Sequence, residues 1–96
     1  MLEVRKSAEF AAWLDGLQDV RARARVQVRI ERLRGGNAGD VKPVGQGISE
    51  LRIDYGPGYR VYFVRKGRAV IVLLAGGDKT TQVADIKAAQ RLAGNL

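Results

Sequence analysis

The residues best suited to chemistry lie on a hairpin near the middle of the chain. Two segments of alternating apolar and polar residues, 48–55 and 59–64, flank Gly56-Pro57-Gly58, a pattern that predicts a β-hairpin with a three-residue loop. If Tyr55 faces Tyr59 across this loop, alternate residues of both strands share one face. That polar face then carries five residues that can bind phosphate or move protons, namely Glu50, Arg52, Asp54, Arg60 and Tyr62.

The same register predicts the neighbours on each face of the hairpin. The expected cross-strand pairs on the polar face are Glu50–Val64, Arg52–Tyr62 and Asp54–Arg60. The opposite face is expected to be buried, because it carries Leu51, Ile53, Tyr55, Tyr59, Val61 and Phe63. Antiparallel sheets commonly expose one face to water, so a solvated surface with ion pairs is the simpler interpretation of the polar face. A phosphate-binding surface is the alternative.

Such a face has the groups that cleavage of RNA requires. The reaction takes a proton from a 2′-hydroxyl, builds negative charge on a pentavalent phosphorane and protonates the departing 5′-oxygen. Clustered arginine and lysine side chains can stabilise the phosphorane without a metal, and Lys42 and Lys79 could reach the same face. The chain has no histidine and no cysteine, so a carboxylate, a lysine or a tyrosine must move the protons. The candidates are Glu50, Asp78, Lys79 and Tyr62.

The charge balance favours an anionic partner. Seventeen basic residues against ten acidic ones give a net charge of +7, and twelve of the basic residues are arginines. A pI near 10.4 is typical of nucleic-acid-binding proteins, although a membrane-surface helix or an acidic protein partner gives the same bias. Within residues 21–34 the candidates for RNA binding are Arg21, Arg25, Arg29 and Arg32. A solvated helix face or a docking face for a protein partner explains them equally well.

The pattern of the first 34 residues predicts a strand and two helices. Residues 2–5 alternate as a short strand, and Ser7 is a candidate N-cap for an amphipathic helix over residues 8–17. Residues 20–30 alternate with period two, which favours a strand. The length of the segment, its alanine and arginine content, the Asp19 cap and the Gly35-Gly36 stop favour a helix ending at Arg34. We therefore expect a helical hairpin.

The rest of the chain completes an α+β fold in one domain, residues 1–96. A glycine-rich loop over residues 35–47, with residues 41–44 extended within it, precedes the β-hairpin. The apolar run 70–74 is expected to be the strand at the sheet centre, and Thr80 or Thr81 to cap a last helix over residues 82–93. The order predicts an N-terminal strand and a helical hairpin packed on a mostly antiparallel sheet, with a C-terminal helix.

The location expected from the sequence is the cytoplasm. Residues 1–10 mix charged and apolar side chains and so do not resemble a signal peptide. No apolar run approaches the roughly 18 residues needed to span a bilayer, so no membrane association is expected.

Several motifs between residues 39 and 86 occur in a combination typical of one superfamily. They lie at residues 39–45, 47–53, 56–63 and 76–79, followed by Gln82 and Asp85-Ile86. Together they resemble the HigB-like branch of the RelE/ParE toxin superfamily, and the resemblance covers nearly the whole chain. The order of helices and strands in that superfamily matches the order predicted above.

This resemblance implies a toxin of a type II toxin–antitoxin module, also called an addiction module. RelE and HigB relatives cut mRNA in the ribosomal A site without a metal, which implies an endoribonuclease (an mRNA interferase) that inhibits translation and needs no cofactor. The basic positions carried over from the family are Lys42, Arg52, Arg60 and Lys79. The implied partners are mRNA, the ribosome with its rRNA, and a cognate helix-turn-helix antitoxin.

Two other functions fit the same sequence. A ParE-like inhibitor of DNA gyrase would bind a protein and perform no chemistry. A non-catalytic module would bind nucleic acid with a steep salt dependence. The family's nucleases often carry a histidine or a late tyrosine, whereas the last tyrosine here is Tyr62, so both alternatives stay open.

Overall fold

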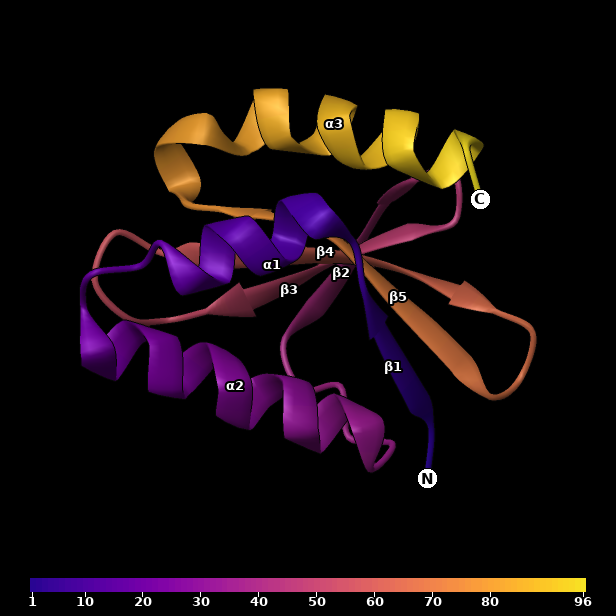
Figure 1. Ribbon diagram of the computed structural model, residues 1–96, viewed down its shortest axis with the longest axis horizontal. Coiled ribbons are helices and arrows are strands. Elements are labelled where there is room, and N and C mark those ends of the chain that lie inside the picture. Colours follow the sequence, from indigo (N-terminus) through magenta and orange to yellow (C-terminus); the bar gives the residue numbers. More distant parts are fainter.

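Three layers make up the fold in the computed structural model, which describes residues 1–96 (Figure 1). A five-stranded sheet is the middle layer. The helices α1 (Ala8–Asp15) and α2 (Val20–Arg34) cover one face of it, and α3 (Gln82–Gly94) covers part of the other. The strands are β1 (Glu3–Lys6), β2 (Val41–Gly45), β3 (Ile48–Ile53), β4 (Tyr59–Lys66) and β5 (Val70–Gly77). A 3₁₀ turn, η1 (Lys79–Thr81), leads into α3. The predicted α+β class is confirmed.

The sheet has the order β1-β5-β4-β3-β2. Only β1 and β5 are parallel, and every other neighbouring pair is antiparallel, so the mostly antiparallel sheet is confirmed. The apolar run forms the interior strand β5, but the central position belongs to β4, because β1 adds one further strand beyond β5. Residues 41–45 form a true edge strand rather than an extended stretch of loop.

The ambiguous segment after Asp19 is a helix, as predicted. The Asp19 carboxylate accepts hydrogen bonds from the backbone N–H groups of Arg21 and Ala22, at 3.0 and 3.2 Å, which satisfies donors left free at the helix start. The buried side chains recur three and four residues apart and face the sheet. They are Ala22, Val26, Ile30 and Leu33. The period of two in the sequence therefore comes from exposed Val20 and Val28, which lie on the outer side.

The other two helices differ from their predictions at single ends. Ser7 caps α1 as expected, but the helix ends at Asp15 and not at Leu17. α3 begins at Gln82 as expected and ends at Gly94, one residue beyond the predicted end. Thr81 holds the N-cap position without a capping hydrogen bond from its side chain, and Asp78 caps the preceding 3₁₀ turn by accepting from Thr80 N.

Two separate cores follow from covering both faces of the sheet. The larger core lies under α1 and α2 and includes the predicted buried face of the hairpin: Leu51, Ile53, Val61 and Phe63, with Tyr55 and Tyr59 packed against them. The smaller core lies under α3 and contains Ile48, Tyr62, Val72, Leu74, Ala75 and Ala89. Part of the face expected to be solvated is therefore buried, because a third helix returns across it.

The hairpin register differs from its prediction by two residues. Ile53 pairs with Tyr59, and the strands are joined by a five-residue loop, Asp54–Gly58, instead of three residues. Tyr55 leaves the strand, so it does not pair with Tyr59. A shift of two keeps each residue on its predicted face but gives it a new partner. The observed pairs are Glu50–Tyr62 and Arg52–Arg60, and the expected Asp54–Arg60 ion pair does not form.

Trp13 joins α1 to the sheet by packing directly on the backbone of β5. Its ring lies so close to Gly76 that a Cβ at that position would be 2.1 Å from a ring carbon. Phe10 and Tyr59 enclose the same ring, with centroids 5.7 and 6.2 Å away. A glycine at residue 76 is therefore required by the close approach of the indole.

No helix of the structure is both long and apolar enough to cross a membrane.

We predict that Gly76→Ala lowers the free energy of unfolding by about 1–3 kcal/mol, because the added methyl group must displace the Trp13 ring. Gly94→Ala is the matched control, since its Cβ would contact nothing within 4 Å and alanine favours the helix. Urea unfolding, followed by the fluorescence of this single tryptophan and by circular dichroism, measures both. Equal stability of the two variants would contradict the packing described.

Candidate functional site

A pocket of about 480 Å³ lies where the β3–β4 loop meets the end of β5. Its polar lining comes from Asp40, Arg52, Asp54, Arg60 and Lys79. Gly56, Pro57 and Gly58 of the hairpin loop and Ile53 complete the lining. Three of the four basic residues carried over from the family resemblance therefore meet in one place.

Arg52 and Arg60 are direct cross-strand partners within this pocket. Like charges placed opposite each other on a sheet are destabilising unless they are neutralised. Asp40 neutralises Arg52, through contacts of 2.7 Å from Nη2 and 3.1 Å from Nε. No carboxylate pairs with Arg60.

The guanidinium of Arg60 is short of hydrogen-bond partners. Its Nε is buried and has none. A buried donor without an acceptor costs free energy, and arginine forks match the oxygens of a phosphate or carboxylate. The arrangement can therefore bind an anion between Arg60, Arg52 and Lys79.

The position of Lys79 depends on a capped turn. The aliphatic part of Lys79 lies against Gly58, whose φ of 80° lets the loop turn beneath it. The side-chain hydrogen bond from Thr80, with the backbone hydrogen bonds, lowers the pKa of Asp78. A carboxylate of lowered pKa is a weak proton acceptor, so the geometry of Asp78 suits capping better than acid–base chemistry.

Glu50 and Tyr62 lie outside the open pocket. Both are buried beneath α3, with exposed fractions of 1% and 0%. The Tyr62 hydroxyl donates to Glu50 Oε2 at 3.0 Å, and Gln82 Nε2 donates to the same oxygen at 2.7 Å. Burial and the charge of Glu50 raise the pKa of Tyr62 well above its usual value. The expectation that both residues sit on an exposed face with the arginines was therefore wrong.

Lys42 points from the edge strand and does not line the pocket. It pairs with Glu50 across β2 and β3 and is exposed. Arg52, Arg60 and Gly77 form the adjacent cross-strand row. The four predicted basic residues thus divide into three that converge and one that lies on the neighbouring row.

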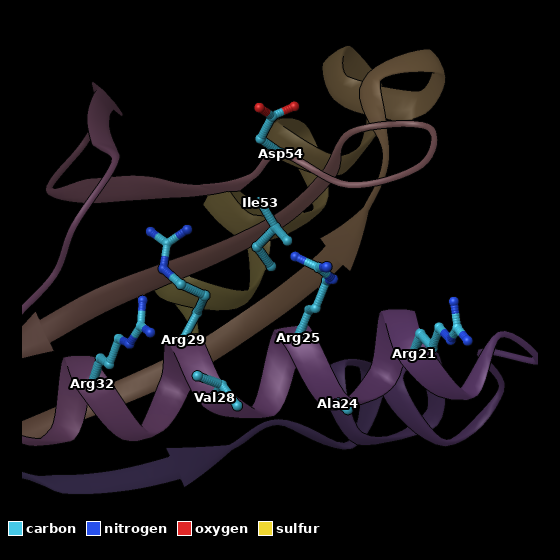
Figure 2. A pocket seen from close by; sticks show the side chains of 8 residues that line it. All are labelled: Arg21, Ala24, Arg25, Val28, Arg29, Arg32, Ile53 and Asp54. Atoms are coloured by element: carbon cyan, nitrogen blue, oxygen red, sulfur yellow. The ribbon is translucent and has the colours of Figure 1, made fainter.

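The arginines of α2 have different environments. Figure 2 shows Arg21, Arg25, Arg29 and Arg32 extending from α2 toward the side where β3 ends. Arg29 donates to the backbone carbonyls of Arg52 at 2.6 Å and Ala38 at 3.1 Å, so it ties α2 to the sheet. Arg25 lies over the Tyr55 ring at 4.6 Å from its centroid. Arg21 and Arg32 form no ion pair or side-chain hydrogen bond.

The sequence reasoning overlooked two residues of this region. Asp40 was assigned to a loop, although antiparallel pairing of β2 with β3 brings it beside Arg52, whose N–H donates to the Asp40 carbonyl at 2.9 Å. Gln82 is expected as the start of a helix and as part of the family motifs, but not as a partner of Glu50. The family motifs include both residues, and the extended residues 41–44 gave a second signal for Asp40.

Comparison with known proteins identifies the family of the chain. The family described as "Phage derived protein Gp49-like (DUF891)" matches residues 12–93. The chain belongs to the Gp49-like family. A protein of Haemophilus influenzae, described as an uncharacterized protein, is 47% identical over 95 residues, which cover 99% of this chain and 96% of the relative.

Membership in the Gp49-like family confirms part of the predicted resemblance. That family is a family of toxins of the toxin–antitoxin type. The HigB-like branch stays a prediction. The matched residues include every strand except β1. All the residues that line the pocket therefore lie within the region that matches the family.

We predict that Tyr62→Phe lowers the free energy of unfolding by about 1–3 kcal/mol near pH 8, because Glu50 loses a buried donor. The raised pKa means that the folded phenol stays protonated while the unfolded one ionises from about pH 10 upward. The stability that the neutral phenol contributes is therefore present below pH 10 and is lost as the pH rises further. Phenylalanine cannot ionise, so the difference between the two proteins should narrow above pH 10.

Urea unfolding followed by circular dichroism between pH 8 and pH 11 measures this difference. Tyr59→Phe is the control, because Tyr59 is only partly buried and its hydroxyl forms no hydrogen bond. A gap between wild type and Tyr62→Phe that stays constant across this range would contradict the prediction.

Proposed function

We propose that this protein is the toxin of a type II toxin–antitoxin module and that it cleaves mRNA on the ribosome without a metal. Membership in a family of toxins of the toxin–antitoxin type supports the toxin role, and that role implies an antitoxin partner. The observation that supports the chemistry is the unpaired Arg60 guanidinium, which faces Arg52 across the sheet and shares a pocket with Lys79. Cytoplasmic location belongs to the same proposal.

The pocket suits the charge that develops during RNA cleavage. The 2′-oxygen attacks the adjacent phosphorus, the bond from phosphorus to the 5′-oxygen breaks, and the products are a 2′,3′-cyclic phosphate and a 5′-hydroxyl. The phosphorane carries more negative charge than the starting diester. Cations held in place beforehand by Arg52–Asp40 pairing and by the η1 turn stabilise that charge with little reorganisation.

Proton transfer falls to groups that line the pocket. Apart from Arg60, the ionisable side chains there that form no ion pair are Asp54 and Lys79. One of them would take the proton of the 2′-hydroxyl and the other would protonate the 5′-oxygen. Glu50 and Tyr62 would instead hold the neighbouring row of the sheet beneath α3, since neither reaches the open pocket.

We predict that Arg60→Ala abolishes toxicity and leaves the fold intact. The substitution removes the unpartnered Nε together with the charge that faces Arg52, so no buried group loses a partner. Arg65→Ala is the matched control, because Arg65 lies on the same strand but is exposed and outside the pocket. Induced expression in a bacterium, with mRNA 5′-ends mapped afterwards, measures the effect.

The outcomes separate the three candidate functions. New 5′-ends inside translated frames that appear with wild type and Arg65→Ala, and disappear with Arg60→Ala, support the nuclease. Growth arrest with intact mRNA and with breaks in gyrase-bound DNA would contradict the nuclease and indicate a gyrase inhibitor. If the wild type does not arrest growth, the result would contradict both toxin functions and favour the non-catalytic binding module.

A further inference from the structure

The outer side of α2 presents apolar side chains to solvent. Val20 and Val28 are 68% and 49% exposed, and Ala24 is exposed between them. Residues four apart lie above one another on a helix, so these three form one line along it. The core side of the helix is a different line, made by Ala22, Val26, Ile30 and Leu33.

A groove of about 530 Å³ runs beside this apolar line, between α2 and the end of β3 (Figure 2). Its apolar lining consists of Ala24, Val28 and Ile53. A second hollow, of about 510 Å³, continues on the other side of Val28, along Gln27 and Glu31. The apolar line is therefore bordered by concave surface on both sides.

The charge beside the line is positive and incompletely neutralised. Arg21 and Arg32 make no ion pair, and Arg25 is fixed over Tyr55. Glu31 pairs with Arg34 at 3.6 Å and does not neutralise them. An anionic partner would therefore meet free charges at both ends of the groove.

The apolar line favours a protein over a nucleic acid. Phosphates would pair with the arginines but would leave Val20, Ala24 and Val28 in water. A helix with apolar residues every three or four positions and carboxylates alongside would bury the valines and pair with the arginines together. We propose that the outer face of α2 is the docking surface for an acidic amphipathic helix, which under the proposed function belongs to the antitoxin.

Docking there places the partner at the edge of the anion pocket. The groove and the pocket share Ile53 and Asp54, so a helix lying along α2 would border the pocket without filling it. Binding to this face needs no ribosome and no cleavage. The proposal rests on the proposed function only for the name of the partner, and its test stands if the nuclease assignment fails.

The probe is a synthetic helical peptide of about twenty residues, with leucines at helical spacing flanked by glutamates. The comparison peptide carries glutamine in place of each glutamate. The ¹⁵N-labelled full-length protein is titrated with each, and chemical-shift changes locate the contact. We expect changes centred on residues 20–32 with Ile53 and Asp54, and at least tenfold tighter binding of the acidic peptide.

Variants test the location. Val28→Asp and the double change Arg21→Glu with Arg32→Glu should each weaken the acidic peptide at least tenfold. All these positions are exposed, and thermal unfolding of each variant checks that it folds. The charge-matched control is Arg65→Glu with Arg68→Glu at the β4–β5 turn, which should change binding less than twofold.

Three results would overturn the proposal. They are shift changes centred on Arg52, Arg60 and Lys79 of the pocket, equal weakening by the control pair, and no binding of the acidic peptide at all. A short RNA that binds α2 in the peptide's place, and is lost with the Arg21 and Arg32 change, would assign the face to nucleic acid. Arg60→Ala should leave the peptide affinity unchanged, which separates this surface from the pocket.

Discussion

The pairing of β3 with β4 positions the groups on which the rest of the site depends. Because Ile53 meets Tyr59, Arg52 stands across from Arg60 and Glu50 across from Tyr62. The first pair concentrates positive charge at the end of the sheet, where one guanidinium is neutralised by Asp40 and the other is not. The second pair joins a carboxylate to a phenol that can donate to it. Of two neighbouring rows on one face, one therefore carries two cations and the other a hydrogen-bonded carboxylate and phenol.

The path of α3 determines which of these rows meets solvent. Gln82, at the first turn of the helix, donates to Glu50 and so holds α3 over the Glu50–Tyr62 row. The turn before it carries Lys79 out over the hairpin loop and into the pocket. One connection therefore buries the carboxylate–phenol pair and adds a third cation beside the arginine row. Buried hydrogen-bonded groups of this kind make the arrangement rigid, and rigidity favours electrostatic stabilisation of a transition state.

The elements that were predicted correctly are those for which most of the local signals agree. Asp19, Gly35 and the length of the segment specified a helix for residues 20–34 against a period-two pattern, and tertiary packing used only the spacing of Ala22, Val26, Ile30 and Leu33. The alternation of the hairpin predicted its two faces, because parity survives a shift of two residues. The register itself depended on a loop of five residues that glycine and proline content alone cannot distinguish from three.

Predictions of the site failed where distant segments meet. Burial of Glu50 and Tyr62 requires α3 to cross the sheet, and no local pattern reports that path. The Asp40–Arg52 pair requires the pairing of β2, which glycines on both sides concealed. Residue type and resemblance to family positions predict Arg60 and Lys79, and the fold brings them together. Their role in cleavage stays a proposal.

The central claim is that Arg60 is an anion-binding group whose partner comes from outside the chain. The most direct measurement is the Nε–H resonance of Arg60 in ¹⁵N-labelled protein during titration with inorganic phosphate and then with a short RNA. Arg34 is an internal control, because its buried Nε also lacks a hydrogen-bond partner but lies 3.6 Å from Glu31. The account predicts a saturable shift of the Arg60 resonance and none at Arg34. An Arg60 resonance that does not move, or that moves only in step with Arg34, would contradict it.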